Sequence, residues 1–272
     1  MRVTRRIAAV SFLFTLTLAL SSGTARAQAG AAEEVSAKIW LGKAPEMEEY
    51  LKTAEIVKIE DVGRGVTNPK RAHLAPGGPF ESMAWKPLRP GMYSGFWESY
   101  KAEIAAYEID KLLGLDMVPP TVERRVKGDL GAAIMWIAPT QSFKDLGGPP
   151  GAPPKHFDSW NRQMVKAKMF DNLIGNRDPN LGNWLKDPAW NLILVDHSRA
   201  LTSIKDNVHK FTRVDALLWE KMKGLTDESL TAAVGQWLGK GEIKAILERR
   251  DRMQKDIDKL VKDLGEAAVF MK

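Results

Sequence analysis

Two polar clusters near the middle of the chain constrain its fold and chemistry more than any other feature. Asp178 and Asn183 lie five positions apart, and Asp196 follows the short apolar run 192–195. Such a run is consistent with a buried strand, which would deliver Asp196 to the first cluster. Carboxylate and amide oxygens suit Mg²⁺ that is bound to phosphates. The sequence therefore predicts a phosphoryl-transfer site, in which Asp178 serves the nucleophile while Asn183 and Asp196 hold the metal.

The first 27 residues have the composition of a secretory signal peptide. A basic start is followed by an apolar run, residues 7–20, and by a small-residue cleavage motif that ends at Ala27. The apolar run is short for a transmembrane helix. We therefore predict that the mature chain begins near Gln28, that it is periplasmic or secreted, and that it keeps no stable membrane span.

Composition excludes several classes of function. The whole chain has a net charge of +6, but four arginines lie in residues 1–27, which contain no acidic residue, so the remainder carries +2. This small charge gives no support to a nucleic-acid partner. The chain has no cysteine, and its four histidines do not show the H-x-x-x-H spacing. Disulfides and cysteine-based metal sites are therefore excluded, and a zinc enzyme is disfavoured.

The pattern of apolar residues predicts an α+β fold in which strands precede helices. Alternation and turn residues predict strands at or near residues 55–60, 70–74, 82–86, 118–122 and 131–137. A helical period over 97–113 predicts one helix among them, preceded by a loop with Pro90, Gly91 and Gly95. A glycine- and proline-rich loop at 147–154 is followed by helices at 160–174, from 226, and at 242–264.

The motifs and their order resemble the atypical, kinase-like families. These are the phosphatidylinositol 3-/4-kinases, the HipA-type kinases and, most closely, the secretory-pathway kinases of the Golgi casein kinase type. The resemblance covers roughly residues 55–205 and rests on the segments 102–114, 118–122, 171–178 and 196–199. Protein kinases also space their catalytic Asp and metal-binding Asn as D-x-x-x-x-N. The resemblance implies a bilobal fold: a small antiparallel-sheet N-lobe with one helix in residues 28–140, and a mainly helical C-lobe in residues 141–272.

The resemblance also implies roles for individual residues. Lys86, at a strand end, matches the lysine that contacts the α- and β-phosphates, and Glu103 matches the helix acid that pairs with it; Glu98 and Glu108 are its rivals. Gly63 and Gly65 either let backbone N–H groups approach phosphate or form a plain hairpin turn.

Four further residues near the predicted site have less specific roles. Asp171 is expected to brace the loop that carries Asp178. His197 is expected to pack in the core. Arg177 and Arg199 either contact phosphate or pair with neighbouring carboxylates.

The function predicted from these residues is an extracytoplasmic kinase. It would use ATP with Mg²⁺ or Mn²⁺ and act on an unidentified hydroxyl of a protein, saccharide or lipid. Two alternatives stay open: a catalytically silent kinase-like binding module, and a nucleotidyl transferase with the same metal site.

Overall fold

A computed structural model describes residues 34–63 and 69–272 of the chain. The predicted signal peptide, its cleavage point near Ala27 and the predicted phosphate-loop residue Gly65 lie outside the described residues. Within these two ranges, no helix is both long and apolar enough to cross a membrane.

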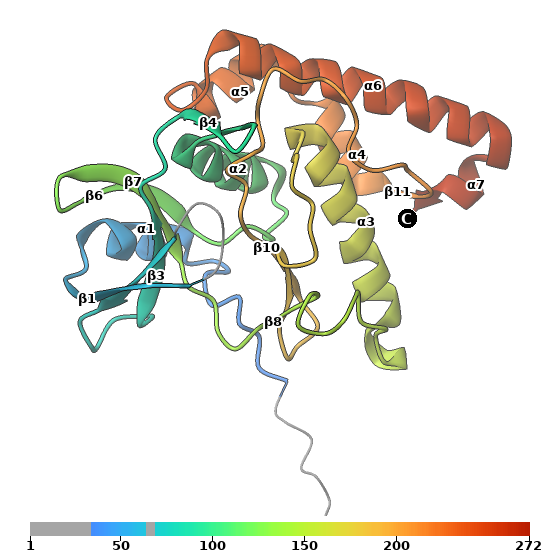
Figure 1. Cartoon of the computed structure of the whole chain (residues 1–272). Helices are drawn as coiled ribbons and strands as arrows, with labels where there is room; N and C mark the ends of the chain where they lie inside the picture. Colours follow the sequence, from blue (N-terminus) through green and yellow to red (C-terminus); the bar gives the residue numbers. More distant parts are fainter. Residues whose placement is uncertain (1–33, 64–68) are drawn as a thin grey trace, which may run out of the picture. The chain divides into compact units, whose positions relative to one another are not determined.

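An antiparallel sheet dominates the first half of the described chain (Figure 1). Its order is β1–β2–β3–β7–β6, with the bounds β1 Ile56–Asp61, β2 Lys70–Leu74, β3 Ser82–Lys86, β6 Thr121–Val126 and β7 Asp129–Met135. The central pair β3–β7 lies close together at Gly131, where a Cβ atom would stand 2.5 Å from the carbonyl oxygen of Lys86. Glycine at this position lets the strand that ends on Lys86 keep its place.

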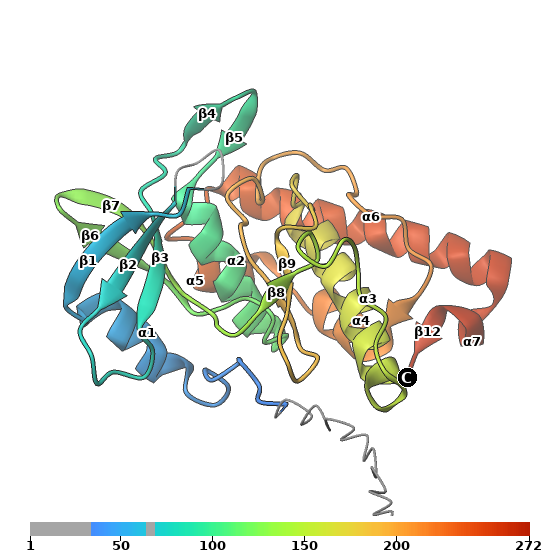
Figure 2. The same ribbon diagram turned by 60° about the horizontal axis from the view of Figure 1, so that its bottom comes forward.

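Two helices cover opposite faces of this sheet. Because side chains alternate along a strand, Ala133 and Met135 of β7 belong to the core cluster of α1 (Ala44–Thr53), whereas Ala132 and Ile134 belong to the cluster that contains the start of α2 (Tyr100–Leu113). Figure 2 shows α1 and α2 on the two sides of the strands. The sequence predicted α2 but not α1, so this part of the chain holds two helices rather than one.

The start of α2 also differs from the prediction. Residues 96–98 form β5 instead of the first helical turn, and Ser99 is the N-cap, whose hydroxyl accepts a hydrogen bond from the Lys101 N–H at 3.1 Å. The helix ends at Gly114, which takes the left-handed conformation as expected of a C-cap. The loop predicted around Pro90 and Gly91 is a hairpin of β4 (Gly91–Tyr93) and β5 (Phe96–Glu98), which projects from the sheet in Figure 2.

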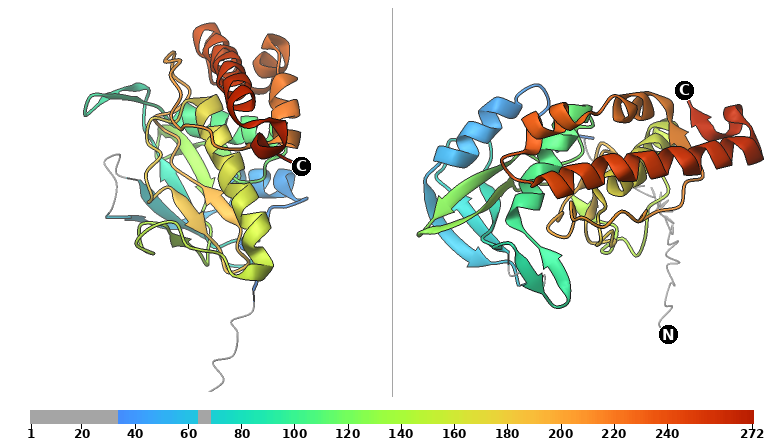
Figure 3. Two further views of the ribbon diagram at one scale, coloured as in Figure 1. Left: turned by 90° about the vertical axis from the view of Figure 1, so that its right-hand side faces the viewer. Right: turned by 90° about the horizontal axis from the view of Figure 1, so that it is seen from above.

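The second half of the chain is mainly helical (Figure 3). The helix α3 (Phe157–Ile174) and the long helix α6 (Lys240–Leu264) pack against each other, and α3 also contacts the strand β10 (Leu192–Leu194). Three short strands, in the order β10–β9–β8, form a second sheet. The bounds are β8 Gln141–Ser142, the 3₁₀ turn Pro154–His156, α3 Phe157–Ile174, β9 Trp184–Lys186, β10 Leu192–Leu194, β11 Val214–Asp215, α4 Ala216–Lys223, α5 Asp227–Val234, α6 Lys240–Leu264, α7 Glu266–Val269 and β12 Phe270–Met271.

The predicted α+β architecture is confirmed: an antiparallel sheet comes first and a helical region follows. The predicted boundary at residue 140 stays a prediction. The strand β8 begins at residue 141, just after this boundary, and pairs with β9. Because β9 also pairs with β10, β8 belongs to the same small sheet as these two strands.

Candidate active site

The side chain of Lys86 faces α2 because of its place in β3. Ala84 lies in the α2 cluster and Trp85 in the α1 cluster, so the alternation of the strand turns Lys86 toward α2. Glu103 lies on the first turns of this helix, on the face that carries the buried Tyr100. The packing of β3 against α2 therefore brings Lys86 and Glu103 together, although they lie 17 residues apart in the sequence.

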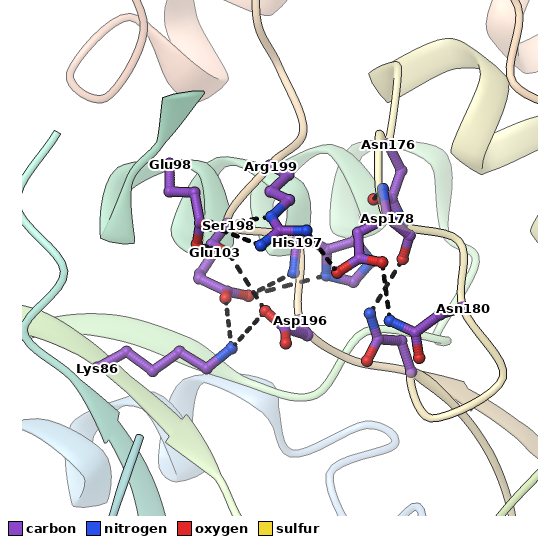
Figure 4. Close-up of polar contacts among 11 residues, drawn as sticks. Lys86, Glu98, Glu103, Asn176, Asp178, Asn180, Asp196, His197, Ser198 and Arg199 are labelled. Carbon is purple, nitrogen blue, oxygen red and sulfur yellow. Dashed lines mark hydrogen bonds and ion pairs between the residues drawn. The ribbon is translucent and has the colours of Figure 1, made fainter. Parts of the chain in front are cut away.

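Lys86 joins two carboxylates from different parts of the chain (Figure 4). Its Nζ donates to Glu103 Oε1 at 2.7 Å and to Asp196 Oδ1 at 2.8 Å. Lys86 and Glu103 are buried, whereas the side chain of Asp196 is 34 % exposed. Burial alone would lower the pKa of the Lys86 ammonium, but the charges of Asp196 and Glu103 outweigh it and raise that pKa above its ordinary value. Burial would likewise raise the pKa of Asp196, but Lys86 lowers it.

Asp196 is presented by the turn that follows β10. Its backbone has a φ of +63°, a left-handed conformation that aspartate adopts more readily than most residues. The next N–H, that of His197, donates to Glu103 Oε2 at 2.8 Å. The His197 ring is buried and nearly perpendicular to the Phe170 ring, with 6.0 Å between the ring centroids, which agrees with its predicted packing role. Burial lowers the pKa of His197.

The loop that carries Asp178 begins where α3 ends. Gly175 caps this helix in the left-handed conformation, and Asn176 then donates its amide to Asp171 Oδ1 at 3.0 Å. The other oxygen of Asp171 contacts His209 Nε2 at 3.1 Å. Asp171 is buried and faces its own loop rather than the cleft, so its predicted bracing role agrees with the contacts.

Asp178 and Asn183 are held together within this loop. The amide of Asn183 donates to the Asp178 carbonyl at 3.0 Å, and Asn180 donates to Asp178 Oδ1 at 2.8 Å. The Asn183 carbonyl oxygen in turn accepts from the N–H of Val195 at 3.0 Å, which places the strand before Asp196 beside the loop. The five-residue spacing therefore forms a closed turn with both side chains on its cleft side.

Four of the predicted site residues line one cleft of about 530 Å³: Lys86, Asp178, Asn183 and Asp196. Glu103 stands behind Lys86 and does not line it. Gly63 is exposed after β1, with a φ of +66°, and is not a lining residue, although its neighbour Val62 is. Apolar side chains from β7 and β9, such as Ile134 and Leu185, complete the wall.

A second ion-pair network lies beside the first, and the part that Glu98 plays in it was not predicted. Glu98, fully buried at the end of β5, accepts from Arg199 Nε at 2.9 Å and from Ser198 Oγ at 3.1 Å. Arg199 also reaches Asp178, with 3.4 Å between Nη1 and Oδ2, and lies over the Phe96 ring at 4.4 Å. Glu98 was a candidate for the partner of Lys86, but it lies at the end of a strand and pairs with Arg199 instead. Of the two roles left open for Arg199, the structure shows pairing with carboxylates.

A buried arginine supports the same loops from α6. Arg249 Nε donates to the carbonyl of Leu173 at 2.7 Å, and its Nη1 donates to those of Thr202 and Ile204 at 3.0 and 2.6 Å. Burial lowers the pKa of this guanidinium to about 10. The sequence predicted only apolar core residues for α6. Arg249 lies between Ile246 and Met253 on the same buried face, and this position of a charged residue within an apolar stripe is the signal that could have identified it.

The donor set fits a divalent ion that also contacts phosphate. Asp196 Oδ2 and Asn183 Oδ1 have no hydrogen-bond partner among the described residues, and both side chains line the cleft. The same ranges contain no group of three or more His, Cys, Asp or Glu side chains arranged for a metal. Mg²⁺ is commonly held by one or two protein oxygens plus substrate phosphates, so two ligands agree with such a shared site.

Comparisons with known proteins identify the fold. No protein-family model and no curated protein sequence match the chain. Solved structures do match. The Golgi casein kinase with Mn and ADP bound has a TM-score of 0.64 and 16 % sequence identity, and the match covers 84 % of this chain and 78 % of that one. Hydra Fam20 with sugar has a TM-score of 0.62 and 16 % identity, with 82 % of this chain and 90 % of that one covered, and the Helicobacter pylori proinflammatory kinase CtkA has a TM-score of 0.51 and 13 % identity, with 78 % and 96 % covered. The chain therefore has an atypical kinase-like fold, as the sequence motifs predicted.

The ion pair between Lys86 and Asp196 predicts a pH-dependent stability. Since Lys86 lowers the pKa of Asp196 in the folded state, ionised Asp196 favours folding at pH values above its ordinary pKa of 3.8, and this contribution disappears as the pH falls through the lower folded value. Asp196→Asn should therefore be less stable than the wild type at pH 7, and the difference should narrow near pH 3. Urea unfolding of both proteins at pH 7 and pH 3 measures the difference in their free energies of unfolding. A difference of equal size at both pH values would contradict the ion-pair account.

Proposed function

We propose that this protein is a phosphotransferase that moves the terminal phosphoryl group of ATP to a hydroxyl group, with Mg²⁺ or Mn²⁺ as cofactor. The observation that carries the proposal is the convergence of Lys86, Asp178, Asn183 and Asp196 on one cleft from three separate segments. The cleft volume of about 530 Å³ is in the range of small-molecule sites. The likeness to a kinase solved with Mn and ADP supports the choice of ligands.

Each residue has one task in the proposed reaction. Lys86, already fixed by Glu103, would donate to the α- and β-phosphates. Asn183 and Asp196 would hold the divalent ion, which neutralises phosphate charge when bound. Asp178 would orient the acceptor hydroxyl and receive its proton. The acceptor oxygen forms a bond to the terminal phosphorus, the bond from that phosphorus to the bridging oxygen breaks, and its electron pair leaves on ADP.

We also propose that this activity is extracytoplasmic. The support is the signal-like composition of residues 1–27 together with motifs that resemble secretory-pathway kinases. The acceptor would then be a hydroxyl of a protein, a saccharide or a lipid in that compartment.

Metal-dependent nucleotide binding is the first expected property. ATP should raise the melting temperature of the mature chain when Mg²⁺ or Mn²⁺ is present, because a ligand that binds only the folded state stabilises it. Asp196→Asn should lose most of this shift, since it removes a metal-binding carboxylate. Thermal-shift measurement with ATP and EDTA is the control. An equal shift of the melting temperature in EDTA would refute the metal assignment. If ATP causes no shift with any metal ion, the likeness to kinases concerns the fold alone.

Export predicts a defined start for the mature protein. When the full chain is expressed in a bacterium with a periplasm, intact-mass analysis of the periplasmic fraction should show a chain that begins near Gln28, because cleavage after Ala27 removes the basic and apolar segments. A full-length product that stays in the cytoplasm would refute the location proposal while leaving the phosphotransferase proposal intact.

A further inference from the structure

One cationic side chain of the cleft lies beside Asp178, and it does not belong to the loop that carries Asp178. The residues from Asp178 to Asn183 include no lysine or arginine. Among the described residues that line the cleft, the cationic ones are Lys86, Lys144 and Arg199. Lys86 is committed to two carboxylates, and the side chain of Lys144 is exposed at the rim. Arg199 is therefore the cation that stands next to the proposed base.

The contacts of Arg199 fix its orientation and leave one nitrogen toward the cleft. Glu98 binds the Nε and Nη2 edge at 2.9 Å, and the Phe96 ring lies against the guanidinium plane. Both partners belong to β5, so the hairpin holds the arginine in place. The remaining nitrogen, Nη1, faces Asp178 Oδ2 at 3.4 Å, a long contact for an ion pair. The side chain of Arg199 is 15 % exposed, and Figure 4 shows it between Glu98 and Asp178.

We propose that Arg199 binds the terminal phosphoryl group of the bound nucleotide through Nη1. This inference rests on the proposed function. Asp178, Asp196, Glu98 and Glu103 bring four carboxylates to the two networks, against the cations Lys86 and Arg199, so a phosphoryl group bound there needs the charge of the divalent ion together with a donor such as Nη1. When a phosphoryl oxygen accepts from Nη1, the weak contact with Asp178 is released, and Asp178 Oδ2 becomes available to the acceptor hydroxyl. The fork geometry of guanidinium allows Glu98 and phosphate to be bound at the same time.

The proposal predicts a specific change in nucleotide preference. Titration calorimetry with Mg²⁺ would compare ADP with the non-hydrolysable β,γ-imido analogue of ATP, which carries the terminal phosphoryl group. Arg199→Met should weaken binding of the analogue on the order of tenfold, as expected for a lost charge-assisted hydrogen bond, and should leave ADP binding nearly unchanged. Arg89→Met is the matched control, since it removes the same charge from an exposed side chain outside the cleft lining and should bind both ligands as the wild type does.

Two further variants separate phosphate binding from a structural role. Glu98→Gln should keep the preference for the analogue over ADP, because Nη1 of Arg199 stays beside Asp178. If the pair of Glu98 and Arg199 only supports the structure, Glu98→Gln and Arg199→Met should instead change nucleotide binding in the same way. Arg199→Met leaves Glu98 buried without its cation and thus endangers folding. The double variant Glu98→Gln/Arg199→Met removes both charges, and if the single variant does not fold, the double variant must show the lost preference.

The outcomes distinguish this inference from the function on which it rests. If the wild type binds neither nucleotide with Mg²⁺ or Mn²⁺, the proposed function fails and this inference fails with it. If the wild type binds and Arg199→Met weakens both nucleotides equally, or neither, only the assignment to Arg199 is wrong. A lost preference in Lys144→Met, with Arg199→Met like the wild type, would assign the phosphoryl group to the rim lysine and overturn the proposal.

Discussion

The two ion pairs of Lys86 are the interaction on which the rest of the site depends. One buried ammonium ties the end of β3 to α2 through Glu103 and to the turn after β10 through Asp196. Lys86 Nζ thus links the sheet, the helix that covers one face of it and the turn after β10. Removal of either carboxylate would leave a buried charge less compensated, so the pair fixes the position of Asp196 relative to the sheet. The His197 N–H adds a second tie, because it donates to the free oxygen of Glu103.

Backbone geometry then aligns the second half of the site with the first. Gly175 ends α3 and lets the chain turn sharply into the loop of Asp178. The buried Arg249 donates to the carbonyls of Leu173, before this loop, and Ile204, in the segment after Asp196. The side chain of Arg199 links the loop of Asp178 to the hairpin through Glu98 and Phe96. The three elements that border the cleft are thus joined by charged groups that are mostly buried.

Much of this could be predicted from the sequence because the informative signals were local. The spacing of Asp178, Asn183 and Asp196 gave the loop and the strand, and the alternation around Lys86 gave its strand. The helix α1 was not predicted, because its buried face consists of only Met47 and Leu51, which is too short a stripe to define a helical period. The pairing of Glu98 with Arg199 joins residues 101 positions apart, and no local pattern specifies such a contact. The roles of Gly63 and Gly65 stay predictions.

The most direct test of the central claim is the fate of the labelled phosphorus atoms of ATP. The mature chain would be incubated with Mg²⁺ or Mn²⁺ and with ATP that is labelled either at the terminal or at the α position, alone and with protein and glycan acceptors. The account predicts that only the terminal label is transferred, that ADP is the product, and that Asp178→Ala lowers the rate by a factor on the order of 10²–10⁴ while still binding nucleotide. Transfer of the α label as AMP, or equal rates for wild type and Asp178→Ala, would contradict it.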